Sequence, residues 1–200
     1  MSLKCRLLLV ALTVVAYHGR AAAQHASTVV IVVRHAEKAS TPTDDPPLTA
    51  AGRARAQVLA TTLAHAGVTA IITTQLIRSR ETARPLADSR GLTLITVPRG
   101  ADIAQHARAV AAAIRRHRGT TVLVVGHGET VGPIISALGG PSIAEICGFE
   151  YSNLYTLVLG DAGTAARFVQ STYGDPSPPH TSPCTTMMNP RPPVAEPERP

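Results

Sequence analysis

The sequence predicts an α/β sandwich built on a mostly parallel β-sheet. Short β-branched runs alternate four times with segments of helical periodicity, and two further apolar runs near the end flank a Gly-Asp-Ala-Gly turn. Of the 200 residues, 44% are hydrophobic and 16% charged, which is enough apolar material for the core of one domain. Strands that alternate with helices favour a sheet of parallel strands joined by helical crossovers.

The first strand and helix have clear boundaries. Residues 29–33 are five consecutive β-branched residues, a pattern typical of a strand buried on both faces of a sheet. A helix follows behind Thr49, an N-cap residue, with apolar side chains at helical spacing until Gly67 ends it. We expect the second strand at residues 69–73.

The middle of the chain continues the alternation. Residues 77–90 predict a helix that breaks or bends at Pro85. Residues 92–97 predict a third strand, and the Ala- and Arg-rich residues 103–118 an amphipathic helix. The histidines other than His35 and His127 have no partners at a telling spacing, so we expect them to lie at the surface.

The last elements close the domain. Residues 122–125 predict a fourth buried strand and residues 131–138 a helix that tolerates Pro133 in its first turn. Residues 153–159 and 164–170 predict a β-hairpin.

The N-terminus resembles a secretory signal peptide over residues 1–23. Lys4 and Arg6 precede an apolar run at 7–17 that is too short to span a bilayer, and three alanines at 21–23 provide a cleavage site. The alternative is a buried N-terminal helix. The signal peptide predicts a secreted or periplasmic protein without a stable membrane anchor after cleavage.

The C-terminus has a different composition. Nine of the 16 prolines lie in the last 25 residues, so we expect a disordered tail over 173–200 and a folded domain over 24–172. After signal cleavage two cysteines remain, Cys147 and Cys184; an oxidising compartment permits a disulfide between them, and two free thiols are the alternative.

Charge and aromatic content exclude some partners. The formal charge is +6, and removal of the three basic residues in the signal segment leaves 16 against 13, which is unremarkable. Aromatic residues make up only 3%. We therefore expect no nucleic-acid partner. The oligomeric state stays open.

The strand ends carry the residues that suggest chemistry. They are Arg34-His35, Thr74 with Arg78 one loop later, Arg99 with Asp102, and Gly126-His127-Gly128-Glu129. Parallel strands end at one edge of a sheet, where ligands of such folds bind. Arginine matches phosphoryl oxygens, a histidine can act as nucleophile, and backbone N–H groups near Gly128 can bind an anion. The set predicts a phosphoryl-transfer site for a small phosphorylated substrate.

Three motifs carry a resemblance to a known family. Arg34-His35-Ala36-Glu37-Lys38, the run 74–83 in which Arg78 is followed four residues later by Thr-Ala, and the run 126–130 resemble signatures of the histidine phosphatase superfamily, whose fold is phosphoglycerate-mutase-like. The match extends from about residue 28 to 170. The resemblance implies a three-layer α/β/α sandwich with one antiparallel strand. It also implies that His35 becomes phosphohistidine, that Arg34, Arg78 and His127 complete the phosphate pocket, and that no metal or other cofactor is needed.

The proton donor is open at the level of sequence. Many family members have a glutamate after the third strand, whereas this chain has Asp102 there; Glu129, two residues past His127, is the alternative. Asp102 is the expected acid by its place after the third strand. The run Thr74-Gln75 also departs from the family pattern.

These observations predict a phosphomonoester hydrolase. A phosphoglycerate-type mutase is the first alternative, disfavoured because the chain lacks the long insertions of cofactor-dependent mutases. A phosphate-binding module without turnover is the second, disfavoured by the presence of both His35 and His127.

Overall fold

A computed structural model of the protein describes the structure of residues 27–160 and 165–177. The expected signal peptide and the tail beyond Ser177, with Cys184, lie outside these residues. The strands are β1 (Thr28–Arg34), β2 (Val68–Thr73), β3 (Leu94–Thr96), β4 (Thr121–Gly126), β5 (Asn153–Leu159) and β6 (Arg167–Thr172). The helices are α2 (Ala50–Thr62), α3 (Ile77–Arg90), α4 (Ile103–Ile114) and α5 (Gly128–Ala137), with a short 3-10 turn, η1 (Arg115–His117).

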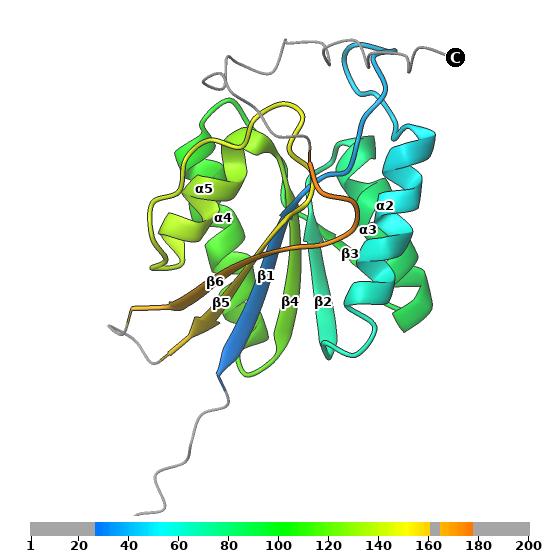
Figure 1. The fold of residues 1–200 in the computed structure, drawn as a ribbon. Coiled ribbons are helices and arrows are strands. Elements are labelled where there is room, and N and C mark those ends of the chain that lie inside the picture. The colour runs from blue at the N-terminus through cyan, green and yellow to red at the C-terminus, as the bar shows by residue number, and fades with distance from the viewer. Residues whose placement is uncertain (1–26, 161–164, 178–200) are drawn as a thin grey trace, which may run out of the picture.

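A six-stranded sheet in the order β3-β2-β4-β1-β5-β6 forms the middle layer (Figure 1). Strands β1, β2, β3 and β4 are parallel, while β5 and β6 run antiparallel to their neighbours. Helices α2 and α3 cover one face, and α4 and α5 cover the other (Figure 1). The predicted three-layer α/β/α sandwich is confirmed, and so is its one antiparallel strand, because β5 alone runs opposite to the other five strands.

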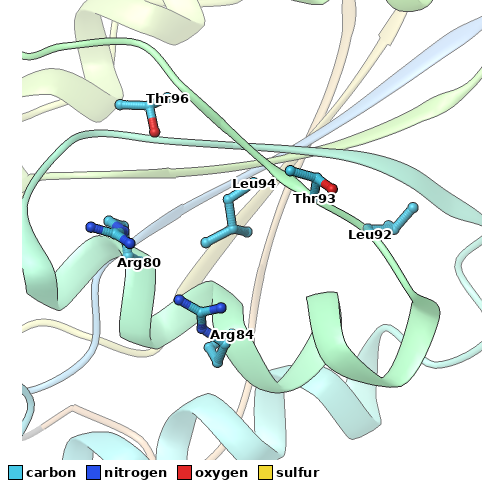
Figure 2. Close-up of a pocket in the computed structure, with 6 residues that line it drawn as sticks. All are labelled: Arg80, Arg84, Leu92, Thr93, Leu94 and Thr96. Atoms are coloured by element: carbon cyan, nitrogen blue, oxygen red, sulfur yellow. The ribbon is translucent and has the colours of Figure 1, made fainter.

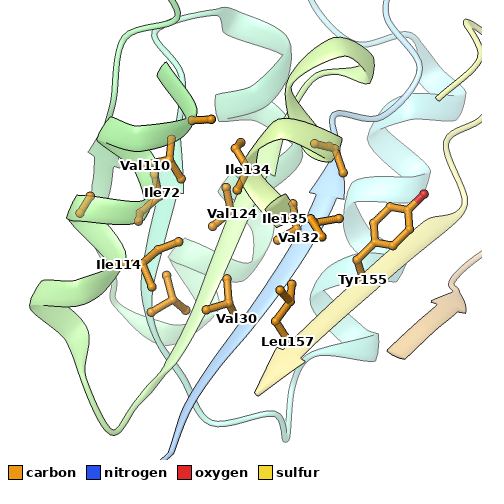
Figure 3. Close-up of a cluster of buried hydrophobic side chains, with 14 of the residues drawn as sticks. Val30, Val32, Ile72, Val110, Ile114, Val124, Ile134, Ile135, Tyr155 and Leu157 are labelled. Atoms are coloured by element: carbon orange, nitrogen blue, oxygen red, sulfur yellow. The ribbon is translucent and has the colours of Figure 1, made fainter. Parts of the chain in front are cut away.

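The β-branched run in β1 serves both faces of the sheet. Val30 and Val32 belong to the core beneath α4 and α5, where Figure 3 shows them with Ile134 and Ile135. Ile31 and Val33 point to the opposite face and pack in the core beneath α2 and α3. Alternate side chains of a strand point to opposite faces, so an uninterrupted apolar run is what a doubly covered strand needs.

The helix ends agree in part with the sequence. Thr49 caps α2, its hydroxyl accepting from the Gly52 N–H at 3.0 Å, and Gly67 adopts a φ of 66°. Helix α3 continues through Pro85 to Arg90, so of the predicted break or bend the break is wrong. Strand β3 is shorter than expected, because only three of its residues pair with β2.

The ordered domain extends beyond the expected boundary at residue 172. Tyr173 is buried in the core beneath α2 and α3, and its N–H donates to the Ser152 carbonyl at 2.9 Å. A buried aromatic side chain supplies a large apolar area. For residues 173–177 the expectation of disorder is therefore wrong.

Candidate active site

Two histidines meet at the edge of the sheet where β1 and β4 end. Arg34, the last residue of β1, pairs in register with Gly126, the last residue of β4, so the residues that follow are neighbours. The ring centroids of His35 and His127 are 5.2 Å apart with the planes inclined by 59°. Both side chains are buried. The convergence expected for parallel strands thus brings together the two imidazoles.

The tautomer of His35 follows from one hydrogen bond. Its Nδ1 lies 2.8 Å from the carbonyl oxygen of Ala36, which can only accept, so Nδ1 carries the proton. Burial, and then the charges of Arg34 and His127, lower the pKa of His35 well below its ordinary value of 6.5. The ring is therefore neutral near pH 7, with the lone pair on Nε2.

The second motif supports the first through Thr82. The Thr82 hydroxyl accepts from the Ala36 N–H at 2.9 Å and donates to the Arg78 carbonyl at 2.7 Å. Ala83, which follows it, is fully buried. The threonine four residues after Arg78 therefore fixes Ala36, whose carbonyl orients His35.

His127 is the N-cap of α5 and belongs to a buried polar chain. Its Nε2 lies 2.9 Å from the Thr74 hydroxyl, which lies 2.7 Å from the Ser79 hydroxyl, while its Nδ1 is buried with no hydrogen-bond partner among the described residues. Burial, followed by the charges of Arg78 and Arg99, lowers the pKa of His127 from 6.5 to about 3.

The start of α5 adds backbone donors to this edge. Gly128 is buried, and a Cβ there would lie 2.9 Å from the Ile146 carbonyl oxygen. The first N–H groups of a helix have no intrahelical acceptor and favour anions. The predicted phosphate-binding position of Gly128 thus lies beside His127, in a place that only glycine fits.

Arg34 is held by backbone carbonyls. Its Nη1 donates to the carbonyl of Cys147 and, at 3.0 Å, to that of Glu150. The guanidinium carbon lies 4.3 Å from the centroid of the Tyr151 ring. The Nε is buried and has no partner within the described residues. Burial is the main cause that lowers the pKa of Arg34.

Arg78 and Arg99 add positive charge to the same edge. Arg78 lies 3.6 Å from Asp45 through Nη1, and its buried Nε has no partner in the part of the chain described. Arg99 pairs with Glu129 at 2.7 Å. Burial is the largest cause that lowers the pKa of Arg78. The charges of Asp45 and Glu129 act to raise this pKa, and that of Arg99 acts to lower it.

The unusual Gln75 holds the loop that carries Arg99. Its amide accepts from the Arg99 N–H at 2.8 Å and donates to the Arg99 carbonyl at 3.3 Å. The departure from the family pattern at Thr74-Gln75 thus has a structural use, since Thr74 contacts His127 and Gln75 fixes Arg99.

The two acid candidates lie in different environments. Asp102 is exposed at the N-cap of α4, where its carboxylate accepts from the Gln105 N–H at 2.9 Å. Glu129 is mostly buried in its ion pair with Arg99, and its charge acts on Arg34 and Arg78. Of the two, Glu129 lies among the pocket arginines.

Sequence reasoning missed His106. This residue of α4 is 4% exposed, so the expectation that it lies at the surface is wrong. Its Nδ1 donates to the Pro98 carbonyl at 3.0 Å, and its Nε2 is buried without a partner among the described residues. Burial lowers the pKa of His106. The signal was present, because Val110 and Ile114 follow it at helical spacing on the buried face.

Glu37 and Cys147 connect the site to its surroundings. Glu37 pairs with Arg55 at 2.8 Å, which anchors the His35 loop to α2. Cys147 is buried and disulfide-bonded. Cys184 lies outside the described residues.

Other features lie away from this edge. A concavity of about 320 Å³ is lined by Arg80, Arg84, Leu92, Thr93, Leu94 and Thr96, between α3 and the free edge of β3 (Figure 2). None of these side chains contacts His35 or His127. Within the described residues, no group of three His, Cys, Asp or Glu is arranged to hold a metal, and every helix is too short or too polar to cross a membrane.

Part of the chain matches a family of known proteins. Residues 30–105 match the model of the histidine phosphatase superfamily, branch 1. Over 76 residues the chain is 38% identical to a protein of Yersinia enterocolitica described as a probable phosphoglycerate mutase, GpmB. That match covers 35% of each chain, so this chain spans about a third of the curated relative.

Solved structures extend the likeness to the whole domain. The protein histidine phosphatase SixA, in complex with tungstate, has a TM-score of 0.59 and 21% identity, covering 72% of this chain and 96% of its own. A mycobacterial glucosyl-3-phosphoglycerate phosphatase has a TM-score of 0.56 and 16% identity, covering 72% and 97%. The chain therefore has the fold of the histidine phosphatases, and its residues 30–105 match the model of that superfamily.

Proposed function

We propose that this protein is a metal-independent phosphomonoester hydrolase that works through a phosphohistidine at His35. The observation that carries the proposal is the 2.8 Å hydrogen bond from His35 Nδ1 to the Ala36 carbonyl. It leaves the lone pair on Nε2, and the lowered pKa keeps that nitrogen unprotonated.

The reaction has two displacement steps. The Nε2 lone pair attacks phosphorus, a P–N bond forms, and the P–O bond to the leaving group breaks. Water then attacks phosphorus, the P–N bond breaks, and inorganic phosphate leaves. One proton of that water replaces the proton that the leaving oxygen took up in the first step. Both steps develop charge on the equatorial phosphoryl oxygens.

The positive groups around His35 would stabilise that charge. Arg34 and Arg78 each have a buried Nε without a partner among residues 27–160 and 165–177, and the start of α5 offers backbone N–H groups. The dianion would also raise the proton affinity of His127, whose pKa is lowered to about 3 by burial first and by nearby positive charge second. A protonated Nδ1 would then donate to the phosphoryl group.

We propose Glu129 as the acid that protonates the leaving oxygen, in place of the expected Asp102. The proposal is supported by the proximity of Glu129 to Arg34 and Arg78 and by the use of Asp102 as an exposed helix cap.

The basic test is turnover of p-nitrophenyl phosphate by the purified protein. Hydrolysis should be insensitive to EDTA and absent in His35→Ala. Inhibition by EDTA that added metal reverses would contradict the metal-independent reaction, and undiminished turnover in His35→Ala would contradict the nucleophile.

The match to a probable phosphoglycerate mutase favours one second candidate, return of the phosphoryl group to the substrate. With a phosphoglycerate labelled at phosphorus, hydrolysis releases labelled inorganic phosphate, whereas a mutase retains the label on glycerate. We expect release. Turnover of either kind would exclude the alternative of a phosphate-binding module without turnover.

We also propose export of the protein, on the basis of residues 1–23. N-terminal sequencing of the protein recovered outside the cytoplasm should begin at Gln24. A cytoplasmic protein that retains Met1 would contradict export.

A further inference from the structure

The segment that follows β6 returns to the edge of the sheet where His35 lies. We refer to residues 173–177 as the C-terminal strap. In Figure 1 this orange segment runs from β6 along α2 toward the end of β1. The proposed reaction assigns no task to it.

The strap is anchored to both the core and the His35 loop. Tyr173 is buried, and its N–H donates to the Ser152 carbonyl. Nη1 of Arg55 donates to the carbonyls of Tyr173, at 3.2 Å, and Asp175, at 3.0 Å. The same guanidinium donates through Nε to Glu37 at 2.8 Å. Arg55 therefore links the strap to the residue two positions after His35.

Ser177 fixes the backbone before β5. Its hydroxyl oxygen accepts from the N–H of Tyr151 at 2.9 Å and from that of Ser152 at 3.2 Å. The two serine hydroxyls lie 3.0 Å apart, and the Ser177 N–H donates to the Ser152 hydroxyl at 3.2 Å. One side chain thus supplies the acceptor for two consecutive backbone donors.

The residue held in this way borders the reacting centre. The Tyr151 ring lies 4.3 Å from the guanidinium carbon of Arg34, a distance at which the ring face attracts the cation. The ring centroid is also 6.2 Å from that of His35. A phosphoryl group within reach of both Arg34 and His35 would lie beside this ring.

We propose that Ser177 is a positioning residue that holds Tyr151 as the aromatic wall of the phosphate pocket, and that Tyr151 determines how tightly Arg34 binds the phosphoryl group. This inference rests on the proposed function, because it takes His35 and Arg34 as the phosphoryl site. It makes the C-terminal strap a part of the substrate-binding machinery.

The test compares variants of the full-length protein. Ser177→Ala removes the acceptor for Tyr151 and Ser152, whereas Ser177→Thr keeps a hydroxyl in its place. Ser171→Ala is the matched control, since its hydroxyl donates to the Leu154 carbonyl in the β5–β6 pair. Calorimetry with tungstate as the probe measures pocket affinity without turnover, and p-nitrophenyl phosphate gives KM and kcat.

We expect Ser177→Ala to raise the tungstate Kd and the KM about 3- to 10-fold, as for loss of one or two ordinary hydrogen bonds, with a smaller change in kcat. Ser177→Thr should restore both values, and Ser171→Ala should leave them unchanged. Tyr151→Leu should match Ser177→Ala, and the double variant should be no worse than either single variant because both changes disable one ring.

The inference is overturned if Ser177→Ala matches Ser171→Ala in Kd and KM, or if it lowers only the melting temperature. It is also overturned if the two changes add fully. Failure of the proposed function would give a different result. Tungstate binding would still respond to the Ser177 variants, but the protein would not hydrolyse p-nitrophenyl phosphate.

Discussion

The rings of His35 and His127 lie 5.2 Å apart although 92 positions separate the two residues in the chain. They are neighbours because β1 and β4 are parallel and paired up to Arg34 and Gly126. Each ring is tied down on one nitrogen, His35 by the Ala36 carbonyl and His127 by Thr74. The other nitrogen of each ring is thereby left for chemistry.

The first prediction concerns pH. Because His127 has a folded-state pKa of about 3, below its ordinary 6.5, the unfolded chain binds more protons between these values. This pKa shift should contribute its whole effect to the free energy of unfolding above pH 6.5, and the contribution should be lost as the pH drops toward 3. Urea denaturation of the native protein and His127→Asn measures this, and the variant should show a shallower fall.

The exposed His65 provides the control, since His65→Asn should reproduce the native pH profile. Identical slopes for the native protein and His127→Asn would show that His127 does not carry the predicted proton linkage.

The second prediction concerns the arginine fork. Arg78→Lys keeps the charge but loses the planar donors, including the buried Nε. Turnover of p-nitrophenyl phosphate should fall by about 10²-fold or more, as for loss of one preorganised donor. Arg80→Lys, two positions along on the exposed side of α3, should keep the native rate. Equal rates in both variants would place Arg78 outside the pocket.

The fold and the centre of the site were predictable because both depend on local pattern. The β-branched run of β1 indicates a doubly covered strand, and strand ends in a parallel sheet must converge near Arg34 and His127. The packing of Tyr173 and the contacts of Ser177 and Arg55 were not predictable, because they join segments far apart in the chain. The burial of His106 was predictable from its helical spacing with Val110, although its lack of a catalytic partner at a telling spacing favoured the surface.

The third prediction concerns the close approach of α2 to the His35 loop. A Cβ on Gly52 would lie 2.2 Å from the Glu37 carbonyl oxygen, and neither backbone can yield easily. Gly52→Ala should lower the free energy of unfolding by about 1–3 kcal/mol, as for overpacking, and slow turnover. Gly100→Ala is the control, because no atom lies within 4 Å of its added Cβ. A fully stable Gly52→Ala protein would contradict the contact.

The fourth prediction identifies the acid. Asp102→Asn should leave both an alkyl phosphate and p-nitrophenyl phosphate unaffected, because asparagine also caps helices well. Glu129→Gln should slow the alkyl phosphate strongly and spare p-nitrophenyl phosphate, whose phenolate leaves without a proton. The reverse pattern, with Asp102→Asn selective for the alkyl substrate, would restore Asp102 as the donor.

The most direct test of the account is to trap the phosphorylated enzyme. Rapid acid-free quenching of the native protein with a phosphorus-labelled aryl phosphate, followed by peptide mapping, locates the label. We expect base-stable, acid-labile phosphate on Nε2 of His35, absent in His35→Ala and present in the Arg80→Lys control. Label on His127, or undiminished label in His35→Ala, would contradict this expectation.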